Sequence, residues 1–163
     1  MAATVTIRVV YGAPAGTTSG SITGIDLESA DNAENSQANR LANPIIVGNR
    51  SYEKWLKAYI DVAPDNKVEN FECWGDGAVE ANTTLYLGKI SSGSYGQPVT
   101  TPSSIANVDW TVCTSGSKYN WSSGSIHDVG AVSDFLVFQL DVEAGADPGN
   151  WTQEQINYEY DES

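Results

Sequence analysis

The chain has 163 residues, with 8 basic and 21 acidic side chains and a formal net charge of −13. A chain of this length fits one domain and buries about two thirds of its surface on folding, so it needs no disulfide or metal for stability. Its acidity argues against nucleic acid and anionic membranes as partners, because affinity for phosphate comes from Lys and Arg. No stretch approaches the ~20 apolar residues of a membrane-spanning helix. The first residues lack the pattern of a secretory signal, so we expect a product made in the cytoplasm.

Alternation of apolar and polar residues predicts strands along most of the chain. The predicted strands are residues 4–10, 20–29, 43–49, 51–62, 67–77, 83–90, 108–113, 134–142 and 151–160. Residues 30–40 predict an exposed loop or a short surface helix, and residues 91–107 and 114–128 predict long polar turns. No long helices alternate with the strands. The pattern therefore predicts an all-β fold, a two-sheet antiparallel sandwich (jelly-roll or Ig-like) of about eight or nine strands, in a single domain spanning residues 1–163.

Residues 51–62 fit two kinds of structure. As a helix, they form one apolar stripe with a weak start, no glycine stop and no partner helix to pack against. As a strand, they place Leu56 and Ile60 on one face. The neighbouring strands favour the strand. We expect it to form a hairpin through the turn at residues 63–66 with the strand at residues 67–77.

The sequence contains no pattern that predicts an active site. His127 is the only histidine, and it lies in a polar loop without a nucleophile elbow. One His and two Cys cannot form a zinc site, and we expect Cys73 and Cys113 to be buried free thiols rather than a disulfide across a sheet. Calcium remains an alternative at residues 72–80 or 141–147, although solvated loop acids are the favoured interpretation. We expect no enzyme activity and no cofactor.

The aromatic residues suggest a second class of function. Five Trp and eight Tyr are compatible with carbohydrate binding, because aromatic faces stack on sugars. Trp121 and Trp151 occur in or beside polar loops and are the candidate surface contact aromatics. The other three tryptophans fall within predicted strands, where packing is the expected role.

Two blocks of the sequence resemble small structural, decoration-like proteins of tailed bacteriophage virions. The first has a Tyr-Glu-Lys-Trp strand followed by a strand with an Asn-aromatic-x-x-Trp ending. The second has a Gln-Leu strand, a Pro-Gly turn and a final strand ending in Tyr-Asp-Glu. The matching residues are Tyr52, Glu53, Lys54, Trp55, Asn70, Phe71, Trp74, Gln139, Leu140, Pro148, Gly149, Tyr160, Asp161 and Glu162.

This resemblance implies a β-sandwich component of the virion, made in the host cytoplasm, and it carries over no catalytic or ligand residues. We expect a capsid decoration, or cement, protein that docks on the outer capsid surface and stabilises it, as a dimer or trimer. Its partners would be the major capsid protein or other virion proteins, and avidity on a repeated lattice would replace a deep pocket. The alternatives are a tail- or fibre-associated structural protein and a carbohydrate-binding module.

Overall fold

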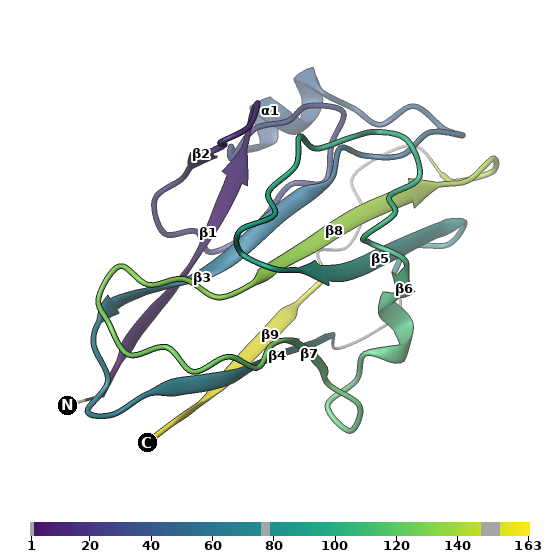
Figure 1. Ribbon diagram of the computed structural model, residues 1–163. Coiled ribbons are helices and arrows are strands. Elements are labelled where there is room, and N and C mark those ends of the chain that lie inside the picture. Colours follow the sequence, from purple (N-terminus) through teal and green to yellow (C-terminus); the bar gives the residue numbers. More distant parts are fainter. Residues whose placement is uncertain (1, 76–78, 148–153) are drawn as a thin grey trace.

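A computed structural model describes residues 2–75, 79–147 and 154–163 of the chain. Its strands are β1 (Thr4–Tyr11), β2 (Thr17–Thr18), β3 (Lys54–Val62), β4 (Val68–Gly75), β5 (Thr83–Ile90), β6 (Val108–Asp109), β7 (Tyr119–Ser122), β8 (Phe135–Val142) and β9 (Ile156–Glu162). They form a six-stranded sheet in the order β2-β1-β3-β8-β5-β6 and a three-stranded sheet in the order β7-β4-β9 (Figure 1). The predicted two-sheet antiparallel sandwich is confirmed.

The main core lies between the two sheets. The large sheet supplies the aliphatic face of β3 and alternate residues of β5 and β8, while β4 and β7 supply Phe71 and Trp121 from the other side. The Phe71 and Trp121 rings lie 5.7 Å apart between centroids. Leu56 and Ile60 are both buried in this core, so the strand interpretation of residues 51–62 is confirmed, with alternate residues on one face.

The predicted hairpin between β3 and β4 is wrong, because the two strands belong to different sheets. Both edges of β3 are occupied, by β1 on one side and β8 on the other. The chain therefore crosses to the small sheet, where β4 pairs with β7 and β9. The register shifts between Glu69 and Glu72, and Asn70 has a positive φ of 53°. This bulge allows Val68 and Phe71 to face the same core although they are three residues apart.

A loop covers the outer face of the large sheet and forms a third layer. Residues 91–107 run back over β3 and β8 after β5 (Figure 1). Tyr95 from this loop packs edge-on against Trp55, with 5.1 Å between ring centroids, and Ala106 is buried beside Phe135 and Val137. Because both faces of β8 are covered, six consecutive residues from Phe135 to Leu140 are buried.

Several segments differ from the prediction. Residues 20–29 and 43–49 form no strand, and only two residues of the predicted strand at 108–113 are extended before a 3-10 helix at Trp110–Val112. The polar segment at residues 114–128 contains β7. A six-residue helix, α1 (Gln37–Ala42), follows an N-cap at Ser36; within the described ranges no helix is long and apolar enough to cross a bilayer. Residues 148–153, which include the expected Pro-Gly turn and the start of the last predicted strand, lie outside the described residues.

Gly88 provides a test of the third layer. A Cβ atom at this position in β5 would lie 1.8 Å from the backbone oxygen of Ile105, so Gly88→Ala must displace the loop or the strand. We expect a loss of about 1–3 kcal/mol in the free energy of unfolding, as for other overpacked sites. Urea unfolding would measure it. The control is Gly93→Ala in the same loop, where an added Cβ meets nothing within 4 Å and the change should stay within about 0.5 kcal/mol.

Candidate functional site

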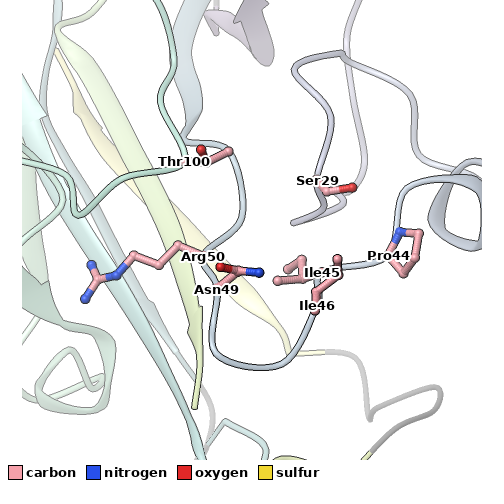
Figure 2. A pocket seen from close by; sticks show the side chains of 7 residues that line it. All are labelled: Ser29, Pro44, Ile45, Ile46, Asn49, Arg50 and Thr100. Atoms are coloured by element: carbon pink, nitrogen blue, oxygen red, sulfur yellow. The ribbon is translucent and has the colours of Figure 1, made fainter. Parts of the chain in front are cut away.

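Exposed apolar side chains gather on one loop region of the sandwich. Among the described residues, Ile46 is 70% exposed, Val47 47% and Val99 39%. Ile46 lines a shallow hollow of about 320 Å³ (Figure 2), and Val47 and Val99 are sequence neighbours of lining residues. Its lining residues are Ser29, Pro44, Ile45, Ile46, Asn49, Arg50 and Thr100. We call this hollow, together with Ile46, Val47 and Val99, the docking face.

A tight turn holds the apolar residues of the docking face outward. The backbone N–H of Asn49 donates to the carbonyl of Ile46 over 3.0 Å, and Gly48 has a φ of 85°, which glycine adopts without strain. The end of β8 fixes this turn. Gly48 donates to the carbonyl of Val142 over 2.7 Å, and Val142 donates to the carbonyl of Asn49 over 3.0 Å. Ile46 and Val47 are therefore displayed on a hydrogen-bonded turn.

Arg50 is the one titratable residue of the lining, and its charge is already used within the fold. Its Nη2 lies 2.5 Å from Oδ2 of Asp141, its Nη1 donates to Oε1 of Gln139 over 3.3 Å, and its guanidinium lies 5.0 Å from the ring centroid of Tyr86. The guanidinium is directed away from the other lining residues (Figure 2). The hollow therefore offers alkyl groups, hydroxyls and an amide, which suit recognition by shape rather than acid–base chemistry.

A buried polar network supports the segment that leads to the docking face. Lys54 in β3 donates from Nζ to the carbonyl of Asn32 over 2.6 Å and lies 3.4 Å from Oε1 of Glu28. The Nδ2 of Asn39 in α1 is 2.7 Å from each Glu28 carboxylate oxygen. Desolvation lowers the pKa of Lys54, and Glu28 opposes that shift. Lys54 and Glu28 are each only 2% exposed in their side chains. Closed off from substrate, this network anchors residues 28–39 rather than forming a catalytic site.

The structure corrects the prediction for Trp121. The residue lies in β7 on the face toward the core and is 1% exposed, with its ring 5.7 Å from that of Tyr158 and its Nε1 donating to Oγ of Ser133. The polar residues on either side of Trp121 predicted a loop, but they flank and form a short strand. Trp121 therefore cannot stack on a ligand. Trp151, the second predicted surface aromatic, lies outside the described residues.

The other reactive side chains form no catalytic arrangement in the described part of the chain. His127 is exposed, and its Nδ1 donates to the carbonyl of Asn66 over 2.8 Å. Cys73 and Cys113 are buried free thiols, as predicted. Asp141, a candidate calcium ligand, pairs with Arg50, and residues 76–78 of the other candidate stretch lie outside the described residues. No group of three or more His, Cys, Asp or Glu among the described residues is placed to hold a metal ion.

Comparisons with known proteins add no identity. No protein-family model, no curated protein and no solved structure matches the chain. The docking face therefore rests on geometry alone. The sequence analysis did not predict it, because the short apolar run at residues 43–49 was interpreted as a strand. Pro44 and Gly48 could have indicated a turn instead, because they enclose only three apolar residues, fewer than a strand of ordinary length.

The burial of the thiols has a measurable consequence. Burial raises the pKa values of Cys73 and Cys113, and the thiolate is the reactive form. We expect neither thiol to react rapidly with Ellman's reagent at pH 8 in the folded protein, and both to react in concentrated urea. Rapid reaction of one thiol in the folded protein would contradict this burial.

Trp121 and Ile46 can be compared by truncation. Trp121→Ala should cost about 3–5 kcal/mol in the free energy of unfolding, because it opens a large cavity in the core. Ile46→Ala should change that free energy by no more than about 0.5 kcal/mol, because the side chain is mostly in solvent. Urea unfolding of the two variants would measure both values. A cost near zero for Trp121→Ala would contradict the burial of this side chain.

Proposed function

We propose that this chain is a structural protein of a tailed-bacteriophage virion, and that it decorates the capsid by docking on its outer surface. The observation that carries the proposal is the docking face, in which Ile46, Val47 and Val99 are exposed around a shallow hollow. Apolar side chains clustered at one surface region are typical of protein–protein contacts. The sequence resemblance to decoration-like virion proteins supports the same role.

The charge distribution is compatible with a protein partner. Six of the eight basic side chains form ion pairs with carboxylates. The other two, Lys57 and Lys89, each lie 6.0 Å from an aromatic ring centroid. The chain therefore presents no surplus of basic groups to bind phosphates. What remains for contact is a net-acidic surface interrupted by the apolar docking face.

A small contact is sufficient on a repeated lattice. A single contact made by three exposed apolar residues and a shallow hollow would bind weakly. Stable pairwise interfaces bury about 1,200–2,000 Å² of surface. Copies joined as a dimer or trimer would engage several lattice positions at once, which raises the overall affinity without any new type of contact. This gain from several simultaneous contacts favours a repeated capsid surface as the partner.

The alternatives differ in what they require of the surface. A tail- or fibre-associated protein would use the same docking face, and the location of the chain in the particle distinguishes it from a decoration protein. A carbohydrate-binding module needs an accessible aromatic face, but Trp121 is buried and every aromatic side chain in the described residues is buried or partly buried. Among its described residues the docking face itself contains no aromatic side chain, so it favours a protein partner over a glycan.

The docking face can be tested with charged substitutions. We expect Val47→Asp and Ile46→Asp each to weaken binding to expanded capsid shells that lack the protein by at least tenfold, measured by co-sedimentation. Desolvating a carboxylate in an apolar contact accounts for this loss. The controls are Val112→Asp and Val129→Asp, which place the same charge at positions that are 57% and 62% exposed elsewhere on the chain.

Two results would contradict decoration. One is that the unaltered protein fails to bind these shells, and the other is that intact particles carry it outside the head. Binding that the control variants weaken as much as the docking-face variants would instead point to general charge repulsion.

A further inference from the structure

The strand β9 is an edge strand with one open side. In the three-stranded sheet it pairs with β4 alone, so its other side has no neighbouring strand among the described residues. An exposed strand edge carries a row of unpaired backbone groups that can pair with a further strand. At seven residues, β9 is longer than either two-residue edge strand of the large sheet, β2 or β6.

The pairing of β9 with β4 shows which backbone groups are open. Lys67 and Ser163 exchange two backbone hydrogen bonds of 3.0 Å each, so these residues form a hydrogen-bonded pair. In an antiparallel pair, such positions alternate with positions whose N–H and C=O groups point the other way. The backbone groups of Ile156, Tyr158, Tyr160 and Glu162 therefore face the open side. None of them has a backbone partner in the described part of the chain.

Carboxylates crowd the outer face of this sheet next to the open edge. Glu69 pairs in register with Asp161, and Glu72 with Glu159. Like charges directly opposite each other on two strands are destabilising. Lysines within the fold neutralise only part of this repulsion: Lys67 pairs with Glu69, and Lys118 pairs with Glu159. At the end of β9, both Asp161 and Glu162 are exposed.

These charges decide what can occupy the edge. A second copy of the chain, paired antiparallel through β9, would bring Glu159 and Asp161 against the same residues of its partner. Each copy also carries a net charge of −13. An extended segment that carries Lys or Arg has the opposite charge, and it would satisfy the open backbone groups at the same time. We propose that the open edge of β9 binds an extended, basic segment of a partner protein by strand addition.

This site is independent of the docking face, because it uses different residues and a different kind of bond. Main-chain hydrogen bonds would supply affinity, and the carboxylates would select basic segments and speed their association. The site is a second point of attachment for a protein that docks through its apolar turn, and it also stands if the docking proposal fails.

Synthetic peptides test the proposal on the full chain. The probe is a nine-residue peptide that alternates Lys with Thr. We expect it to bind at low salt and to shift and protect the amides of Tyr158 and Tyr160 in NMR and hydrogen-exchange measurements. The same peptide with N-methyl groups on alternate backbone amides keeps its charge but cannot pair as a strand, and it should bind at least tenfold more weakly.

Matched variants separate charge from fold. The double variant Asp161→Asn with Glu162→Gln removes two charges, while its amide oxygens can still accept from Asn70 and from the backbone of Ala3. It should bind the peptide at least fivefold more weakly. The control is Glu34→Gln with Glu80→Gln, two exposed acids elsewhere, which should leave peptide binding nearly unchanged.

Three outcomes would overturn the proposal. The first is equal binding of the N-methylated peptide, which would show non-specific attraction to an acidic surface. The second is equal binding of a peptide with Glu in place of Lys. The third is protection of Tyr158 and Tyr160 that depends on the concentration of the protein alone, which would assign the edge to self-association. Val47→Asp should bind the peptide normally, so failure of the docking proposal is distinguishable from failure of this one.

Discussion

One buried amide holds the docking face together. The side chain of Gln139 has no exposed surface, and its Nε2 lies within 3.2 Å of the carbonyls of Ser51, Val99 and Thr101. Its Oε1 accepts from the backbone of Ser103 over 2.9 Å. Thr100, which lies between Val99 and Thr101, lines the hollow, and so does Arg50, which precedes Ser51. Gln139 therefore joins the two segments that carry Thr100 and Arg50, and a buried amide with several partners is costly to disturb.

The hydrogen bonds of Gln139 also fasten the long loop at residues 91–107 to the large sheet. Gln139 of β8 and the contact between Tyr95 and Trp55 of β3 both hold this loop against the outer face of the sheet. Gly88 lets the loop approach the sheet closely at Ile105. A fixed surface loses little conformational entropy on binding. A small contact area can therefore still contribute useful affinity.

The sequence predicted the long strands and the fold class, but it did not predict the docking face. Alternation was sufficient to predict β1, β3, β4, β5 and β8, although β8 is buried on both faces and the bulge in β4 places Val68 and Phe71, three residues apart, on the same core. It failed for residues 20–29, whose buried members include the charged Asp26 and Glu28, because their partners come from α1 and β3 and cannot be read locally. It also failed for Trp121, since a four-residue strand surrounded by Ser, Asn and Gly has the composition of a turn. The sheet to which β4 belongs depended on which edges of β3 were free, and that is a property of the whole fold.

The two proposed surfaces use different physical forces, so salt should affect them in opposite directions. Contact through Ile46 and Val47 is apolar burial, which sulfate or phosphate strengthens because these ions are excluded from protein surfaces. Attraction to Asp161 and Glu162 acts between exposed charges and is screened over about 8 Å at physiological ionic strength. A protein attached at both points would keep its apolar contact at high salt while the basic segment is released. This difference in salt dependence follows from the placement of the charges. Most lysines and arginines are paired within the fold, and exposed acids lie beside the edge of β9. Arg50, the only titratable residue among those described as lining the hollow, directs its guanidinium away from the other lining residues.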